Sequence, residues 1–260
     1  MPNFGGNIVK TLPKTLHMAC AALLAAFSAG AAAVGGLADL TVYDRSEGRS
    51  LPVYWHEGRA WVVGKPGNEY QLNLRSRQGE DVLAVLSVDG VNVISGETAS
   101  VQQSGYVLSP ARSLDVKGWR KDLSRTAAFY FTSLADSYAA RTGRPDNVGA
   151  IGVALFRRKL QEPASIAPVA PQSKSERNDA ASGQGARSAE AQLGTGHGRI
   201  ESSHARTVGF ERATSEPAET VVIYYDSYRN LLARGVIPHA PSARRPAPNP
   251  FPGFVPDPPA

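Results

Sequence analysis

The sequence predicts an all-β protein, an antiparallel β-sandwich with one short C-terminal helix. Short strand-like runs between residues 39 and 159 are separated by Gly, Pro, Asn or Asp about every 8 to 12 residues. Residues 82–88 (VLAVLSV) are apolar on nearly both faces, as in a central strand covered on both sides. Asp89-Gly90 then joins this run to a second β-branched run at 91–94, which is a strong hairpin signal because both turn positions need positive φ.

Other strands are expected where apolar and β-branched residues alternate with polar ones. Tyr70, Leu72 and Leu74 alternate with polar residues, as in a strand with one solvated face. Further strands are expected at 40–43, 51–55, 60–63, 106–108, 113–116, 127–131 and 149–156. At 133–140 (SLADSYAA), Ser133 and Asp136 have the spacing of a capping box, so one or two helical turns or an ordered loop fit there.

The composition divides the rest of the chain. Residues 160–192 are rich in Ala, Ser, Gln and Pro and are expected to form a disordered linker, because they offer too little apolar surface to offset chain entropy. Residues 193–237 are expected to complete the sandwich, with a strand at 220–225 and a helix at 226–234 between an Asp226 N-cap and Gly235. Residues 238–260 form a proline-rich tail, expected to be extended and disordered.

The N-terminus has the features of a secretory signal. Lys10 and Lys14 precede the charge-free segment 18–38, which ends in small residues, so 1–38 is interpreted as a signal peptide and 39–159 as the start of the sandwich domain. An uncleaved membrane anchor is the alternative, but Ala and Gly dominate the segment and favour insertion only weakly. The single cysteine, Cys20, excludes a disulfide framework, and its surroundings do not suit lipidation. A periplasmic protein without a stable membrane anchor is therefore expected.

The charge balance argues against a nucleic-acid partner. The chain has 28 basic and 23 acidic residues, and cleavage of the signal would remove two lysines, which leaves 26 against 23, a net charge of about +3. The basic residues are scattered among acidic ones, and the only short clusters are 157–159 and 244–245. Neither cluster is a nucleic-acid footprint.

Several segments resemble a known group of sequences. They are SVDGVNVISGE (87–97), GYVLSP (105–110), GWRK (118–121), SYAARTGRPDNVGAIGVALFR (137–157), GTGHGR (194–199) and YYDSYRNLLARGVIP (224–238). Together they resemble an uncharacterised family of exported proteins from Gram-negative proteobacteria. The resemblance implies a location in the Gram-negative envelope and brings no activity, cofactor or catalytic residue with it.

The motif Gly194-Thr195-Gly196-His197-Gly198 is the most conspicuous local pattern. Its backbone N–H groups could cradle an anion while His197 supplies an acid or base, although a glycine-rich loop packed against the sheet explains it as well. The strand-motif-helix context of a dinucleotide site is missing, and the histidine spacing predicts no metal site. No Gly-x-Ser-x-Gly elbow occurs, and the acids that a glycoside hydrolase could pair are Glu57, Asp89, Asp115 and Asp122.

The leading interpretation is a non-enzymatic, exported periplasmic module that binds or scaffolds an envelope component. Aromatic residues beside hydrogen-bonding and basic groups can form a platform for a sugar or peptide, although strand aromatics are also typical core residues. The expected partner is an envelope protein or polysaccharide, with no cofactor, no metal and no nucleic acid. The expected contact residues are Trp119, Arg120, Arg141, Arg144 and His197. The alternatives are an envelope-polymer hydrolase with His197 as acid or base, and a complex component whose proline-rich tail docks a partner.

Overall fold

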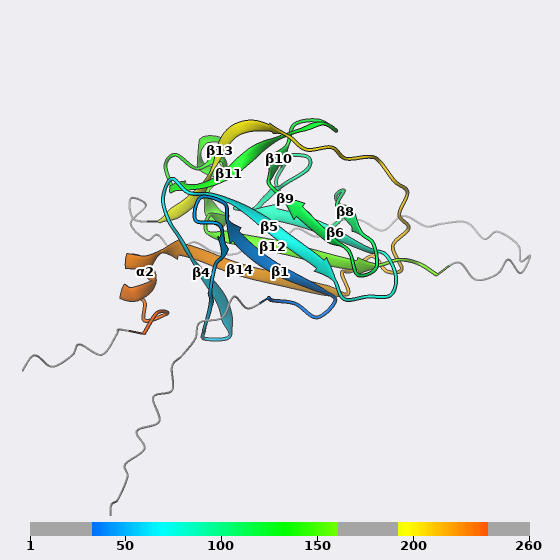
Figure 1. Cartoon of the computed structure of the whole chain (residues 1–260), viewed down its shortest axis with the longest axis horizontal. Helices are drawn as coiled ribbons and strands as arrows, with labels where there is room; N and C mark the ends of the chain where they lie inside the picture. The colour runs from blue at the N-terminus through cyan, green and yellow to red at the C-terminus, as the bar shows by residue number, and fades with distance from the viewer. Residues whose placement is uncertain (1–32, 161–191, 239–260) are drawn as a thin grey trace, which may run out of the picture.

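Two seven-stranded β-sheets pack face to face in the computed structural model, which describes residues 33–160 and 192–238 (Figure 1). This arrangement confirms the predicted all-β sandwich. Sheet A contains β1 (Ala38–Asp44), β2 (Arg49–Ser50), β5 (Glu69–Ser76), β9 (Ser113–Val116), β10 (Gly118–Arg120), β11 (Arg125–Ser133) and β13 (Leu193–Ser202). Sheet B contains β3 (Val53–His56), β4 (Arg59–Gly64), β6 (Val82–Val88), β7 (Val91–Asn92), β8 (Tyr106–Leu108), β12 (Ala150–Arg157) and β14 (Glu219–Ser227).

Three short helical elements accompany the sheets: α1 (Tyr138–Arg141), the 3-10 turn η1 (Pro145–Asn147) and α2 (Tyr228–Ala233). The α1 helix lies against β13, and α2 follows directly from β14 (Figure 1). Within the described ranges no helix has the length and apolar character needed to cross a bilayer.

The last strand of the described chain lies in the middle of sheet B. The order of that sheet is β3-β4-β14-β12-β6-β7, and β14 pairs in parallel with β4 and antiparallel with β12. Val221, Ile223 and Tyr225 of β14 are buried in the core between the sheets. Because β14 pairs with β4 on one side and with β12 on the other, removal of the C-terminal segment would split sheet B into two separate parts.

The strongest local signals of the sequence correspond to elements with closely similar bounds. The runs at 82–88, 106–108 and 113–116 are β6, β8 and β9. Asp89 and Gly90 form the turn between β6 and β7 with φ of 53° and 72°. The strand after the turn ends at Asn92, two residues earlier than the expected 94, because the Asn92 side chain accepts hydrogen bonds from the N–H groups of Ile94 and Ser95.

Four local expectations are corrected by the structure. The glycine-rich segment interpreted as a loop is the ten-residue strand β13, and the short strand β10 was not expected. The N-cap of α2 is Ser227, whose hydroxyl accepts from the N–H of Asn230, instead of Asp226. Likewise Ser137 caps α1, while Ser133 and Asp136 form a turn before it. A hydroxyl at the correct backbone position decides the cap, and spacing alone does not identify it.

The expected boundary at residue 38 falls inside the fold. Ala38 is the first residue of β1, Val34 bridges to Leu40, and the N–H groups of Gly36 and Leu37 donate to the Glu219 carboxylate at 2.6 Å. A mature chain that begins at 39 would lose these contacts, so the sandwich extends back to Val34. Most of the expected signal peptide, nearly all of the linker and the tail beyond Pro238 lie outside the described residues.

We expect Gly90→Val to lower the free energy of unfolding by at least about 1 to 3 kcal/mol, because a β-branched residue at positive φ is strained. A Cβ at this position would also lie 2.7 Å from the Asn147 Cβ. Chemical denaturation should compare it with Gly79→Val, because Gly79 has no positive φ and no atom within 4 Å of the added Cβ. Equal stabilities of the two variants would contradict this role of the turn.

Candidate functional site

The two sheets are joined by a buried hydrogen-bond cluster centred on Asp89. The carboxylate Oδ1 accepts from the Gly149 N–H at 2.9 Å and the Tyr225 hydroxyl at 2.5 Å, and Oδ2 accepts from the Thr195 N–H at 2.7 Å. The Thr195 hydroxyl lies 2.6 Å from the Tyr225 hydroxyl and 2.7 Å from that of Tyr70. We call these four side chains, Asp89, Thr195, Tyr225 and Tyr70, the Asp89 cluster.

The Asp89 cluster is structural and does not form an active site. Burial raises the pKa of Asp89 to about 6, although hydrogen bonds from the Tyr225 hydroxyl and from backbone groups of Gly149, Thr195 and Ala150 oppose the shift. Burial also raises the pKa of both tyrosines well above the ordinary value. Perturbed carboxyl groups often mark catalytic sites. Here, however, Asp89, Thr195 and Tyr70 have no exposed surface and Tyr225 has 1%, so a substrate cannot reach the carboxylate.

The glycine-rich motif is explained by this cluster and by close packing. It was expected that its N–H groups could cradle an anion, and the anion that receives the Thr195 N–H is the carboxylate of Asp89 in the same chain. On the opposite face of β13, a Cβ on Gly196 would lie 2.2 Å from Cζ of Tyr130, so only glycine fits beneath that ring. The strand then bulges between the pairs Ala127–Ile200 and Phe129–His197.

His197 lies beside two aromatic rings at the edge of sheet A. Its imidazole is nearly parallel to the Trp119 indole, with an interplanar angle of 9° and centroids 6.3 Å apart. The Tyr138 ring lies 5.6 Å away, tilted by 34°. Trp119 is 3% exposed and packs edge-on against Phe129, whereas His197 is exposed. The imidazole is therefore an exposed ring that lies parallel to a buried indole, with the two ring centres 6.3 Å apart.

Two nearby cations affect the pKa of the His197 imidazole. Partial burial lowers the pKa of His197, and the positive charges of Lys121 and Arg141 lower it further. Lys121 follows β10 and Arg141 ends α1, and both side chains are exposed. We call Trp119, Lys121, Tyr138, Arg141 and His197 the His197 face.

The structure brings three of the five expected contact residues, Trp119, Arg141 and His197, into the His197 face. Arg120 forms hydrogen bonds outside this face. Its guanidinium donates to the Tyr106 hydroxyl at 2.9 Å and to the carbonyl and hydroxyl of Ser203 at 2.8 and 3.0 Å. Arg144 lies 5.9 Å over the Tyr138 ring and donates to the Gly96 carbonyl, so it braces Tyr138 from behind.

The acids considered for a hydrolase do not meet His197. Asp89 is buried in its own cluster, Asp122 pairs with Arg125 at 2.6 Å, and Glu57 lies at the β3–β4 turn near His56. Asp115 faces Asn73 across β9 and β5. Across residues 33–160 and 192–238, His197 has no carboxylate within hydrogen-bonding distance, and no three His, Cys, Asp or Glu side chains gather as metal ligands do.

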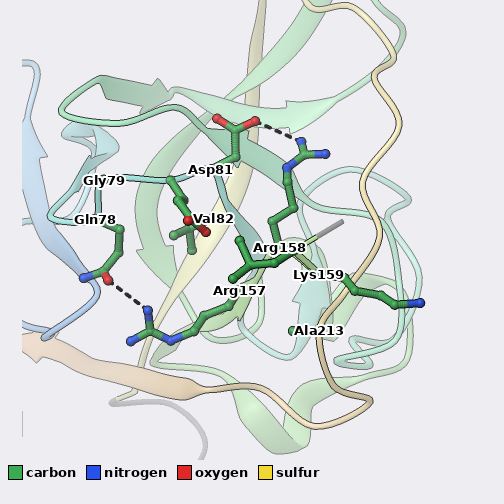
Figure 2. Close-up of a pocket in the computed structure, with 10 residues that line it drawn as sticks. Gln78, Gly79, Asp81, Val82, Arg157, Arg158, Lys159 and Ala213 are labelled. Carbon is green, nitrogen blue, oxygen red and sulfur yellow. Dashed lines mark hydrogen bonds and ion pairs between the residues drawn. The ribbon is translucent and has the colours of Figure 1, made fainter. Parts of the chain in front are cut away.

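A separate hollow of about 600 Å³ lies at the end of β12 (Figure 2). Its cations are already partnered: Arg158 pairs with Asp81 at 2.9 Å, and Arg157 donates to the Gln78 side chain at 3.0 Å. Lys159 points away and pairs with Glu211 (Figure 2). Its arginines already have hydrogen-bond or ion-pair partners, so we treat it as a weaker candidate site than the His197 face.

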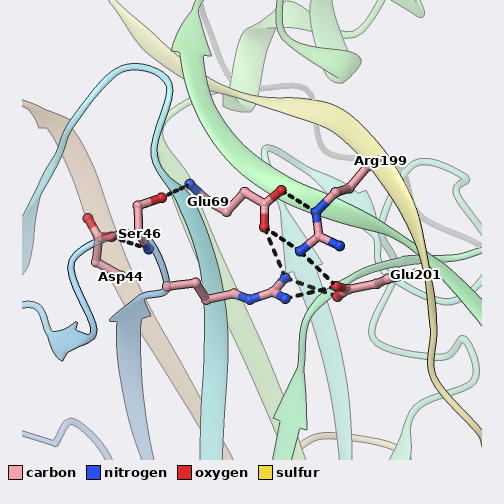
Figure 3. A network of polar contacts seen from close by, with 6 residues as sticks. Asp44, Ser46, Glu69, Arg199 and Glu201 are labelled. Atoms are coloured by element: carbon pink, nitrogen blue, oxygen red, sulfur yellow. Dashed lines mark hydrogen bonds and ion pairs between the residues drawn. The ribbon is translucent and has the colours of Figure 1, made fainter.

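The outer face of sheet A shows the same pairing of charges. Glu69 accepts two hydrogen bonds from Arg199 at 2.7 and 2.9 Å, and Arg45 donates two to Glu201 at 3.0 and 2.8 Å (Figure 3). The two pairs also contact each other, which links β13 to β5 and to the end of β1. Lys121 and Arg141, like Arg112 and several other cations of the described ranges, have no carboxylate within 4 Å.

Comparison of the chain with family models, with curated proteins and with solved structures found no match. The class of protein is therefore defined by fold and site alone: a β-sandwich with an exposed histidine and two exposed cations near buried and half-buried aromatic rings.

Sequence reasoning missed the connections of Asp89. The Asp-Gly pair predicted a turn, and that turn is present, but the partners of the carboxylate are 60, 106 and 136 residues away. The only signal was Tyr225, whose polar hydroxyl falls within the apolar strand predicted at 220–225.

We expect the stability of the wild type to depend on Asp89 between about pH 4 and 6. The folded chain holds this proton more tightly than an unfolded chain with the ordinary pKa of 3.8, so the free energy of unfolding falls as the pH rises through this window. A shift of about two units corresponds to on the order of 3 kcal/mol. Denaturation of wild type and Asp89→Asn from pH 4 to 7 should show the wild-type advantage shrinking with rising pH. Parallel curves would contradict the titration of Asp89 in this range.

We expect the NMR titration of the His197 ring to have its midpoint below the ordinary pKa of 6.5, because burial and two cations disfavour the imidazolium. Lys121→Ala and Arg141→Ala should each move the midpoint upward. Arg229→Ala, which removes an exposed arginine from α2, is the control and should leave it unchanged. If the titration midpoint is the same in wild type, Lys121→Ala and Arg141→Ala, the two charges do not affect the pKa of His197.

Proposed function

We propose that this chain is an exported periplasmic β-sandwich that binds or scaffolds a component of the Gram-negative envelope and has no catalytic activity of its own. The single observation that carries the proposal is the composition of the His197 face. Its neighbours are aromatic rings and unpaired cations, which suit binding, and no described carboxylate is placed to make His197 an acid–base catalyst.

The periplasmic location is supported by the sequence. Lys10 and Lys14 precede the charge-free segment that ends near residue 38, as in a secretory signal. Ala31, Ala33 and Ala38 are small residues that could each end the signal, and cleavage after Ala31 or Ala33 would keep the contacts of residues 34–38 with the sandwich. The resemblance to exported proteins points to the same compartment.

The hydrolase alternative makes different demands on the structure. Envelope polymers are cleaved by paired carboxylates or by a nucleophile with an adjacent base, held within a few ångströms of each other. A His197 with a lowered pKa is neutral near pH 7 and could accept a proton. It lacks a described partner that would orient the ring or supply the complementary acid.

The test uses the chain expressed from its natural start in a Gram-negative host. We expect a shortened chain in the periplasmic fraction, and we expect the purified protein to sediment with isolated cell envelopes without releasing new reducing ends. Lys121→Ala/Arg141→Ala should sediment less than wild type, and Arg229→Ala should behave like wild type. Release of reducing ends by wild type and not by His197→Ala would replace this proposal with the hydrolase.

A further inference from the structure

We propose that the proline-rich segment 239–260 of this chain docks in cis on the outer face of sheet B, across a row of aromatic side chains formed by Tyr54, Trp61 and Tyr224. We call these three side chains the aromatic row. The proposal concerns a different face of the sandwich from the His197 face, and it does not depend on the binding function proposed there.

The position of the aromatic row follows from strand pairing. Tyr54 on β3 pairs with Trp61 on β4, and Trp61 pairs with Tyr224 on β14. Directly paired residues project from the same side of a sheet, and the neighbours of Trp61 along β4, Ala60 and Val62, belong to the core between the sheets. The row therefore lies on the outer face of sheet B. The rings of Trp61 and Tyr224 are in contact, with centroids 5.0 Å apart.

The described chain covers the aromatic row only in part. The α2 helix and the residues after it form an apolar cluster that packs against Tyr54 and Trp61. Tyr224 lies outside that cluster, and the Arg59 guanidinium is 5.6 Å from the centre of its ring. All three side chains of the row are half-buried, so part of each still reaches the surface. The row is therefore an aromatic surface with room for a further apolar partner.

The described part of the chain ends at this surface. Ile237 packs in the apolar cluster against the row, and Pro238 is the last described residue, so the segment 239–260 begins beside the row. Neighbouring strands lie about 4.8 Å apart, so three strands span about 10 Å. A polyproline II segment rises about 3.1 Å per residue and crosses that distance in about three or four residues. Covalent attachment also gives the segment an effective concentration on the order of millimolar, so a weak contact is enough for docking.

The composition of the segment suits aromatic rings. Residues 246–252 read PAPNPFP, and eight prolines fall between 239 and 260. Proline fixes φ at about −65°, so such a segment loses little conformational entropy when it binds. Proline-rich segments dock on aromatic-lined surfaces. Because proline lacks a backbone N–H, a run with proline at every second position cannot extend the edge strand β3 as a ladder partner. Docking across the rings is therefore favoured over strand addition.

The experiment is NMR paramagnetic relaxation enhancement on the purified full chain. A nitroxide is attached at Ala247→Cys in a Cys20→Ser background, so that the label has a single site. We expect it to attenuate the amide signals of Trp61 and Tyr224 on sheet B. The amide of Asn73, which alternates with core residues on β5 and so lies on the outer face of sheet A, is the internal control and should be spared.

Two sets of variants test the two partners of the contact. Tyr224→Ala should lower the attenuation at Trp61 about threefold or more, because it removes an aromatic contact. Tyr130→Ala, which removes a half-buried tyrosine from sheet A, is the matched control and should leave it unchanged. Replacement of the four prolines of 246–252 by Ser should abolish the attenuation. The same change at the three prolines of 256–259 should not.

The outcomes decide the proposal. Absence of attenuation at the aromatic row, equal attenuation of both sheets, or attenuation that survives Tyr224→Ala each overturns it. Attenuation in a mixture of isotope-labelled chain without nitroxide and unlabelled chain with nitroxide would place the segment on a second copy and overturn docking in cis. Thermal melts check that each variant is folded. The proline variants leave every described residue unchanged, so they test the proposal even if Tyr224→Ala does not fold.

Discussion

The buried carboxylate of Asp89 is the constraint on which the arrangement of the two sheets depends. A carboxyl group without exposed surface is costly unless hydrogen-bond donors surround it. The three donors come from β13 of sheet A, from β14 of sheet B and from the segment before β12. The Asp89 carboxylate accepts from all three donors at once. The positions of β13, β14 and the start of β12 at this end of the sandwich are therefore tied to the position of the β6–β7 turn. The raised pKa of Asp89 measures how incompletely these hydrogen bonds compensate the burial.

The same constraint explains the geometry of β13 and of the face beside it. Thr195 points inward to Tyr225 and Tyr70, so Gly196 takes the outer face beneath the Tyr130 ring. The bulge that follows places His197 at the rim, where the core ends and Trp119 forms the base. A structural polar group and a candidate binding residue thus lie two positions apart on one strand. Thr195 holds the strand in place through its hydrogen bonds, and His197 on the same rigid strand exposes its ring to solvent.

The pairing of charges differs between parts of the surface. On the outer face of sheet A two arginines are neutralised by nearby carboxylates, and at the end of β12 Arg158 pairs with Asp81, whereas Arg157 donates to the uncharged amide of Gln78. Around His197 two cations share a ring and face no described acid. Like charges near one ring repel each other and lower stability slightly, and under the proposed function they would serve to bind a ligand.

The sequence by itself determined the fold class, most strands and the β6–β7 turn, because alternation of apolar residues and positive-φ turns act between near neighbours. It also identified Trp119, Arg141 and His197 as residues of interest. Only the tertiary structure decided that the glycine-rich segment is a strand, since Tyr130 and Asp89, distant in sequence, supply the packing and the hydrogen bond that hold it. It also decided that Arg120 is hydrogen-bonded to Tyr106 and Ser203, and that the charge of Lys121 acts on His197. Hydrogen-bond partners and unpaired charges depend on which strands become neighbours, and this pairing is fixed by the whole core and not by local pattern.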